Sequence, residues 1–511
     1  MAFEDVYLGI LHKLPGIQEP ARSPNFKTRL KWTGLIVLAY FLMTQITVFG
    51  VASQGYEQFR FLSILMGSEF GSLMSLGIGP IVTAAIILQL LVGSGVIPWD
   101  MQSDKGKMLF QGSQKLFGII LAFIEALIYV GMGAIPPSSP DLFWIVVLQI
   151  ALGGVLVVFM DETVSKWGFG SGIGLFIVAN VSKSMIIRMF NPLTQSGTFP
   201  GPGTAPSGAI PFALTAIGAG EPLNAFLSLM PVIATVLVFV LVIYAQAIRV
   251  EIPLAFGSVR GFGRRWPLKF FYTSNIPVIL AAALLANVQL MARSLYSSGI
   301  EWLGTFDTQG NPTGGLVYLL TAPRLDSIAG LMIFIGAFIL IGILVARFTK
   351  KNNLHFGLAG AVLGGIAWYA FASAMGLSSL LAITGMDVLR LFTYSSFMIV
   401  GAMIFALFWV QTSGMDAGSV AGQIQSTGMQ IPGYRRDIRI IERVLKKYIS
   451  PLTILGGASV GFLAAYADFT GALGTGTGIL LATTIIYQLY EQIAQQHMED
   501  MHPAIRRLLG K

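Results

Sequence analysis

The chain contains no cysteine in its 511 residues, which excludes disulfide bonds and thiolate metal sites. Charged residues are also scarce, at 11% of the chain. The histidines fall outside the long apolar segments, and there are only four: His12, His355, His497 and His502. No phosphate-binding loop motif occurs either. These absences predict a protein that is not an enzyme, with no catalytic residues, no metal ion and no cofactor.

Long apolar segments dominate what remains. Hydrophobic residues make up 54% of the chain, and the mean hydropathy is +0.73. Segments of about twenty residues with almost no charge match the length that a helix needs to cross ~30 Å of hydrocarbon. The strands of a membrane β-barrel would instead alternate in polarity over about ten residues. We therefore expect an all-α polytopic membrane protein with about twelve spans, near 31–51, 75–97, 113–133, 142–160, 171–190, 224–248, 269–292, 327–347, 356–376, 389–411, 449–467 and 474–492.

Lys and Arg are distributed unevenly between the two sides of these spans. If both termini are cytosolic, only six of the 32 basic residues reach the outer side or its span ends, which leaves 26 inside. Those six are Arg60, Lys183, Arg188, Arg293, Arg324 and Arg390. Cytosolic loops carry such an excess of positive charge, so we expect this orientation. The first 20 residues lack the pattern of a cleavable signal peptide and fit either an amphipathic surface helix or a frayed cytosolic lead-in.

Two expected cytosolic loops, 249–269 and 412–448, hold far more basic residues than orientation requires. In the second, Ile438, Ile441 and Leu445 share one face of a predicted amphipathic helix. Topology and contact with anionic lipid, at ~1 kcal/mol per basic residue, explain one such cluster as well as a partner does. Two clusters favour docking of a large polyanion, and RNA at a ribosome surface is the candidate that we infer. The ribosome-facing residues would be Arg260, Arg264, Arg265, Arg435 and Arg436.

The segment 76–95, LGIGPIVTAAIILQLLVGSG, is apolar enough to enter a bilayer but is broken at its start by glycines and a proline. Ile78 and Val82 lie four residues apart and share one helix face. Ile173 and Ile177 repeat this spacing beside further glycines. A ring of such side chains seals a pore by dewetting and still yields to a passing chain. Ordinary helix packing would produce the same pattern.

At this segment the chain resembles SecY, the channel subunit of the protein-conducting translocon in its archaeal and eukaryotic form. The other similar segments follow in the family's order and cover most of the chain outside about 327–376. They are GSGIGLFIVANV (170–181), SNIPVILAAALLANVQL (274–290), FWVQTSGMD (408–416), ADFTGALGTGTG (467–478) and the ending YEQ…HPAIRRLLGK. Glycine-rich apolar runs are common, but the whole set in order is a specific signal.

The resemblance implies a SecY-like channel of two inverted five-helix halves, 1–210 and 211–511. Its constriction would be a ring of apolar side chains, which the match places at Ile78, Val82, Ile173, Ile177, Ile279 and Leu463. A plug that closes the channel from outside would lie at about 57–67. On the sequence alone, that segment fits a re-entrant or interfacial loop equally well.

The resemblance also implies a lateral gate that opens the channel toward the lipid. Thr83, Gln89 and Asn287 would face this gate, because uncharged polar groups in apolar helices hydrogen-bond across helix contacts at ~1 kcal/mol or less. Static adhesion between helices would use the same residues. Glu125 is the one carboxylate in the middle of a span, where ionisable residues are usually functional. For this family we expect it to form a structural pairing near the gate.

The implied function is a passive conduit, through which unfolded secretory polypeptides cross the membrane and transmembrane segments leave sideways into the bilayer. The implied partners are a ribosome, nascent chains with their signal sequences, and small membrane subunits of SecE and Sec-beta type that complete a heterotrimer. The membrane would be the plasma membrane of an archaeon or, alternatively, the endoplasmic reticulum. A secondary transporter also uses inverted repeats and broken helices, but it needs ion-coordinating groups that this chain lacks apart from Glu125. An intramembrane enzyme would need buried His, Cys or paired Asp.

The chain departs from the family in the number of spans, since the family has ten. The two surplus spans lie within 327–376 and turn at the basic segment 347–351, so they preserve the orientation of everything that follows. We expect a peripheral hairpin packed outside the channel. Glycines at 357, 360, 364 and 365 indicate close packing between its two helices.

Overall fold

The computed structural model describes residues 7–9, 11, 13–22, 24–52, 71–101, 103–131, 133, 135–194, 198–201, 204–256, 263–273, 276–297, 299–307, 311–323, 326–349, 353–375, 383–426, 429–430, 437–473 and 476–501. The expected plug at 57–67 lies outside them, as do Arg260, Arg435 and Arg436.

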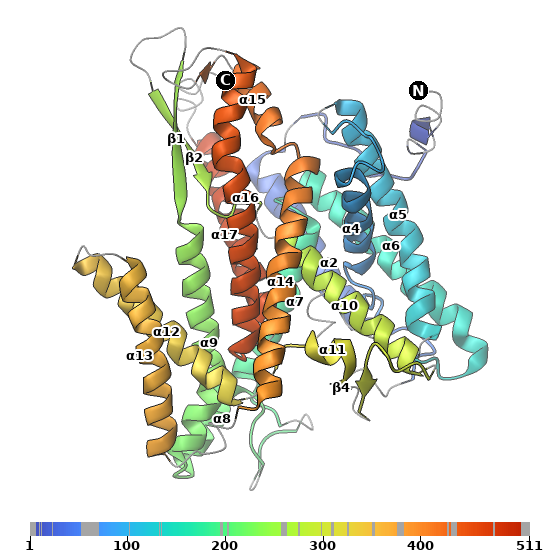
Figure 1. Cartoon of the computed structure of the whole chain (residues 1–511). Coiled ribbons are helices and arrows are strands. Elements are labelled where there is room, and N and C mark those ends of the chain that lie inside the picture. The colour runs from blue at the N-terminus through green and yellow to red at the C-terminus, as the bar shows by residue number, and fades with distance from the viewer. Residues whose placement is uncertain are drawn as a thin grey trace.

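Twelve long helices make up most of the described chain, and each coincides with one expected span (Figure 1). They are α2 (Phe26–Gln45), α4 (Gly79–Gly93), α5 (Asp104–Gly131), α6 (Phe143–Trp167), α7 (Gly172–Phe190), α9 (Pro222–Gln246), α10 (Ile276–Ser297), α12 (Asp326–Phe348), α13 (Asn353–Ala374), α14 (Gly385–Thr412), α16 (Ile438–Phe469) and α17 (Gly476–Met501). Within the described ranges, nine helical segments are long and apolar enough to cross a membrane. The total of twelve spans stays a prediction, because α2, α4 and α17 do not meet both conditions.

The remaining elements are short. They are η2 (Pro140–Leu142), α8 (Ala209–Gly218), α11 (Gly315–Leu319), α15 (Ala417–Ser426), β1 (Arg249–Phe256), β2 (Gly263–Lys269), β3 (Thr305–Phe306), β4 (Pro312–Gly314) and β5 (Met429–Gln430). The strands form one antiparallel sheet of order β2-β1-β5 and a two-stranded β3-β4 ribbon. In the first sheet Arg249 pairs with Lys269, and Ala255 pairs with Gln430.

Backbone chemistry sets where the helices begin and end. α4 is shorter than the expected span because Gly77 and Gly95 adopt positive φ angles of 53° and 78°, and Pro80 occupies the first turn. α14 begins with a capping box, in which Thr384 accepts a hydrogen bond from the Asp387 amide and Asp387 accepts one from the Thr384 amide.

α16 differs from the prediction. The expected amphipathic helix and the expected span at 449–467 form one continuous helix of 32 residues, with Pro451 inside it. Ile441 and Leu445 are fully buried against Ile252 and Leu268 of the sheet, whereas Ile438 is exposed. Packing on the sheet therefore outweighs the hydrogen bond that a proline removes from a helix interior.

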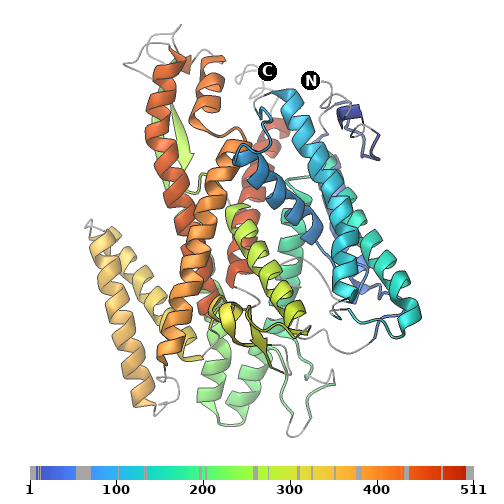
Figure 2. The same cartoon turned by 45° about the vertical axis from the view of Figure 1, so that its right-hand side comes forward.

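The helices pack around one continuous apolar core (Figures 1 and 2). α4, α5 and α6 pack together on one side, and α14 packs on α16 on the other. α10 contacts both α4 and α14 and so joins the two groups. The β1–β2 sheet and α15 lie at one end of the molecule, and α8 and β4 lie at the opposite end. We call these the sheet end and the α8 end.

The N-terminal segment packs on the sheet-end parts of α5 and α6. Residues 7–9 and 11 are helical, and the Tyr7 hydroxyl lies 2.8 Å from Ser113 Oγ. Lys166 Nζ donates to the Ile17 carbonyl at 2.7 Å, and Trp167 Nε1 donates to that of Gln18 at 2.9 Å. This part of the chain is therefore held by protein contacts rather than frayed, and a position of its short helix on the membrane surface stays a prediction.

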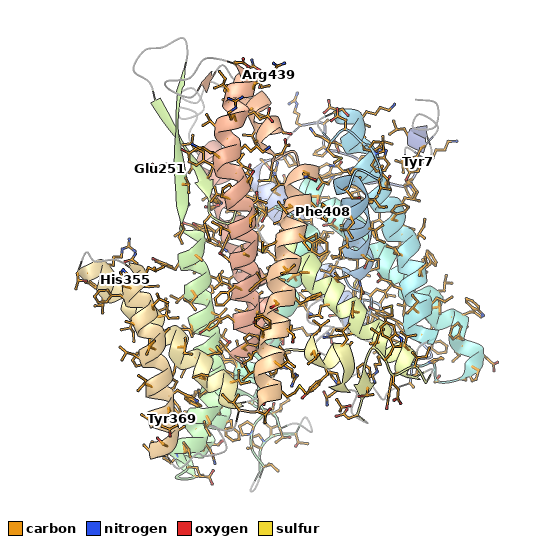
Figure 3. The ribbon with its side chains drawn as sticks, viewed as in Figure 1. Tyr7, Glu251, His355, Tyr369, Phe408 and Arg439 are labelled. Carbon is orange, nitrogen blue, oxygen red and sulfur yellow. The ribbon has the colours of Figure 1, made fainter. Side chains whose placement is uncertain are left out.

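α12 and α13 form the helical hairpin within the expected 327–376 segment, and among the described elements α13 packs principally on α12 (Figure 2). A Cβ at Gly360 would lie 2.3 Å from the Phe338 carbonyl oxygen, so the two backbones approach as closely as glycine permits. α12 docks on α9 and α16, where the Tyr466 hydroxyl donates to the Met332 carbonyl at 2.6 Å. Tyr369 lies on α13 and is 65% exposed (Figure 3).

Candidate functional site

A cavity of about 830 Å³ opens among α4, α5, α6, α7, α10, α14 and α17. Val82, Ile173 and Ile279 contribute apolar side chains to its lining. Its polar lining includes Arg29, Lys107, Gln111, Gln114, Asp161, Ser165, Gln488 and Gln492. The cavity is therefore a partly charged, wettable space that borders the apolar core.

Three of the six expected ring residues, Val82, Ile173 and Ile279, line this cavity. Ile78 and Ile177 lie one helical turn beyond Val82 and Ile173, and they are only 2% and 1% exposed. All five belong to the same apolar core or pack against it. Ile78 and Ile177 therefore form a second group of branched apolar side chains, next to the cavity lining and almost without solvent exposure.

Leu463 has a different position. It lies on α16, where it is partly buried against the core, and it does not line the cavity. α17 lines the cavity instead, through Ile485 and Leu489. Ile485 Cγ2 lies 3.3 Å from the position that a Cβ at Gly174 would take, so α17 packs directly beside the start of α7. The sequence carried no signal for Ile485, because its apolar neighbours on α17 look the same.

The expected gate residues lie on α4 and α10. Gln89 is 2% exposed and lines the cavity, and Thr83 and Asn287 are partly buried. The Thr83 hydroxyl lies beside the Glu125 carboxyl of α5. Within the described residues, however, Thr83 Oγ1, Gln89 Oε1 and Glu125 Oε2 find no hydrogen-bond partner. Thr83 and Glu125 therefore approach each other across the contact between α4 and α5, and the gate role of Thr83, Gln89 and Asn287 stays a prediction.

The contact between α4 and α14 depends on a small residue. Phe408 of α14 points toward α4 (Figure 3), and a Cβ at Gly93 would lie 2.6 Å from its Cδ1 atom. The same Cβ would lie 3.2 Å from the Phe408 Cβ, so a rotation of the ring alone would not relieve the overlap. The sheet ends of α4 and α14 approach each other this closely only because residue 93 is glycine.

The two basic loops lie side by side at the sheet end, because β5 of the second loop pairs with β1 of the first. Arg264 and Arg265 lie on β2, opposite Leu254 and Pro253 of β1. The exposed face of α16 adds four basic residues, which are Arg439, Arg443, Lys446 and Lys447. Figure 3 shows Arg439 at the extreme sheet end of the molecule, above Glu251 of β1. Glu491 of α17 pairs with Lys269 and with Arg249, and so ties the base of the sheet to the helical core.

Comparison with families of known proteins gives two matches. Residues 72–490 match the family described as SecY. Residues 38–71 match the family described as the plug domain of Sec61p, and this range includes the expected plug at 57–67.

Individual relatives match over nearly the whole chain. The protein translocase subunit SecY of Methanothermobacter thermautotrophicus is 41% identical over 501 residues, which cover 97% of both chains. That of Methanocaldococcus jannaschii is 39% identical and covers 98% of this chain and 99% of its own. Among solved structures, "The structure of a protein conducting channel" matches with a TM-score of 0.76 at 38% identity, over 97% of this chain and 98% of that one. "Sec61 in the Canine ribosome-channel complex from the endoplasmic reticulum" matches with a TM-score of 0.73 at 38% identity, over the same shares of the two chains.

Proposed function

This chain belongs to the SecY family and is a protein-conducting channel subunit of a membrane, and we propose that its polypeptide path runs through the cavity and then between the ring residues. The observation that carries the proposal is the change in lining along one axis. A wettable space of about 830 Å³ is followed by branched apolar side chains from α4, α7 and α10. A hydrated chain entering from the sheet end therefore meets a dry constriction.

The constriction seals by dewetting and opens by side-chain displacement. Val82, Ile173 and Ile279 form its first layer, and Ile78 and Ile177 form the second. Branched aliphatic side chains have no polar atoms to hold water or ions, and they make no directional bonds that a passing chain must break. We include Ile485 of α17 in the ring because it lines the cavity beside α7. Leu463 stays a prediction from the family resemblance.

Lateral release would occur between α4 and α5 on one side and α10 and α14 on the other, where α4 contacts both α10 and α14. Thr83 and Gln89 would take part, because buried polar atoms without partners weaken a helix contact. Asn287, partly buried on α10, would face the same contact from the other side. Glu125 of α5 lies in the same region, because its carboxyl group is next to the Thr83 hydroxyl. A signal sequence that packs better than these groups do would separate the helices.

The sheet end would be the cytosolic, ribosome-facing end. The basic residues of the two loops would add to the exposed basic residues of α16 to make one positive surface there, and phosphate contacts made by such a surface are salt-sensitive. The canine Sec61 relative was solved in a ribosome–channel complex. We extend the ribosome to this chain as a partner, together with SecE-type and Sec-beta-type subunits and an archaeal plasma membrane with both termini cytosolic.

Site-specific photocrosslinking to a stalled nascent chain tests the path. Probes at Val82 and Ile173 are expected to crosslink to the chain. A probe at Ile86, which lies on α4 but does not line the cavity, is the matched control. Crosslinks at Ile86 alone, or at none of the three, would contradict the path and return attention to a secondary transporter built around Glu125.

Charge reversal tests the ribosome-facing surface. Arg264→Glu, Arg265→Glu and Arg435→Glu together should weaken ribosome binding and flatten its dependence on salt, while membrane insertion of the channel stays unchanged. Lys27→Glu, at the exposed start of α2, is the control for charge alone. Unchanged ribosome affinity in the triple variant would show that these loops only set topology.

A further inference from the structure

Asp161 lies six residues before the end of α6, and its carboxyl group connects this helix to the start of α7. Its Oδ1 atom accepts a hydrogen bond from the Ile173 amide at 2.9 Å and one from the Ser171 hydroxyl at 3.4 Å. Ser171 is the N-cap residue of α7, yet its own side chain makes no capping hydrogen bond. The first amides of a helix need an acceptor from outside the helix. Here a carboxylate of the preceding helix supplies it.

The backbone geometry around Asp161 leaves little freedom for this connection. A Cβ at Gly172 would lie 2.5 Å from Asp161 Cα and 2.9 Å from its Oδ1 atom, so only glycine lets the two helices approach this closely. The turn before it is also held from outside, because the Phe169 amide donates to Thr33 Oγ1 of α2 at 2.9 Å. The start of α7 is therefore fixed from two neighbouring helices.

What is fixed in this way is part of the constriction. The Ile173 amide donates the hydrogen bond that Asp161 accepts, and Ile173 and Asp161 both line the cavity. Ile177 follows one turn later, 1% exposed. α7 packs more extensively on α17 than on α6. The hydrogen bond from the Ile173 amide to Asp161 and the close approach of Gly172 to Asp161 link α6 to the first turn of α7.

We propose that Asp161 is a positioning residue of the channel seal: it holds the first turn of α7 in the register that keeps Ile173 and Ile177 in the constriction. The role rests on the proposed ring. Loss of the acceptor frees the first amides of α7 to seek water from the cavity. The turn then unwinds or rotates, and the seal loses two of its side chains while the rest of the helix stays in place.

The neighbouring carboxylate provides a matched control. Glu162 points away from α7 and pairs with Lys115 at 2.7 Å and Lys166 at 3.0 Å. It is one residue along the same helix and carries the same charge. A variant at 162 therefore reports general disturbance of this end of α6, and a variant at 161 reports loss of the link to α7.

The first experiment measures ion efflux from vesicles that contain the full-length channel. Asp161→Ala should raise closed-channel efflux on the order of tenfold, as expected when a capping acceptor is lost and its helix end frays. Asp161→Asn keeps an oxygen acceptor and should stay near wild type, as should Glu162→Ala. Gly172→Ala pushes the two helices apart by another route and should leak as Asp161→Ala does.

A second readout separates loss of position from general loosening. Because the chain has no cysteine, Ile177→Cys and Ala402→Cys each introduce a unique thiol. Ala402 is fully buried on α14, away from α7. When Asp161→Ala is combined with each of these variants, a polar maleimide should label the thiol at 177 about tenfold faster and the thiol at 402 at an unchanged rate. Equal acceleration at both sites would overturn the proposal, since it would mean that Asp161 only supports stability.

The two levels of the inference fail differently. If Ile173→Gly and Ile177→Gly leak but Asp161→Ala does not, the ring stands and the role of Asp161 is refuted. If none of the three leaks, the ring itself is wrong and the positioning role is refuted with it.

Discussion

Replacing Gly93 by alanine should weaken the closed state of the lateral gate. The new Cβ would lie 2.6, 3.1 and 3.2 Å from Cδ1, Cγ and Cβ of Phe408, whereas ordinary contacts of this kind are 3.4–4 Å. Rotation of the Phe408 side chain moves Cδ1 and Cγ but leaves Cβ in place, so no rotamer clears all three contacts. Strain of this kind is relieved only if α4 and α14 separate.

The magnitude follows from the cost of overpacking. Inserting one methyl group into a tight contact costs about 1–3 kcal/mol. The open gate does not carry this cost, because Phe408 has then moved away from α4. The ratio of closed to open channels should therefore fall by about 5- to 150-fold.

Vesicle ion efflux measures this ratio in the absence of substrate. Gly93→Ala should raise efflux, and Phe408→Ala combined with it should restore the closed level, because the second change removes the obstructing ring. Gly365→Ala on α13 is the control, since a Cβ there meets nothing within 4 Å. The reasoning is refuted if Gly93→Ala behaves like Gly365→Ala, or if removal of the Phe408 ring does not suppress the leak.

Two further contacts yield predictions about stability. Tyr466→Phe removes the hydrogen bond from the hydroxyl to the Met332 carbonyl and should lower the free energy of unfolding by about 1 kcal/mol. The unfolding temperature should fall slightly, and proteolysis between α12 and α13 should become faster. An unchanged proteolysis rate would mean that the hairpin docks by apolar packing alone. Arg390→Ala removes two donors to the Tyr318 and Thr321 carbonyls, each at 3.2 Å, and should lower the free energy of unfolding by about 1.5–3 kcal/mol. Amide hydrogen exchange should become faster over α11. Equal exchange rates in the variant and in wild type would show that α11 is held by its apolar side chains.

Much of the fold was predictable because it depends on local sequence. Apolar length alone located the twelve long helices, and α7 (Gly172–Phe190) differs from its expected span by one residue. The boundaries that failed are those where packing outweighs a local signal. α4 was expected at 75–97 and is shorter because of two glycines with positive φ, and α16 continues through Pro451 because its buried face rests on the sheet.

The candidate site was predictable only in part. Ile78, Val82, Ile173 and Ile177 carry a visible spacing of four residues, and the structure brings Val82 and Ile173 to one cavity. Ile279 came from the family match and lines that cavity too, whereas Leu463 came from the same match and does not. The role of Ile485 depends on how α17 faces α7, and nothing local distinguishes it from its apolar neighbours.

The sequence by itself determined that this is a helical membrane protein, roughly where its long helices lie, and which family it belongs to. These properties depend on hydrophobic length and on residue order, which a chain carries whether or not it is folded. Only the tertiary structure decided that the two basic loops join through β1 and β5, that Gly93 admits Phe408, and that Asp161 caps the helix which carries Ile173. Each of these joins groups from different elements, and such contacts depend on the relative placement of whole helices rather than on any pattern within one of them.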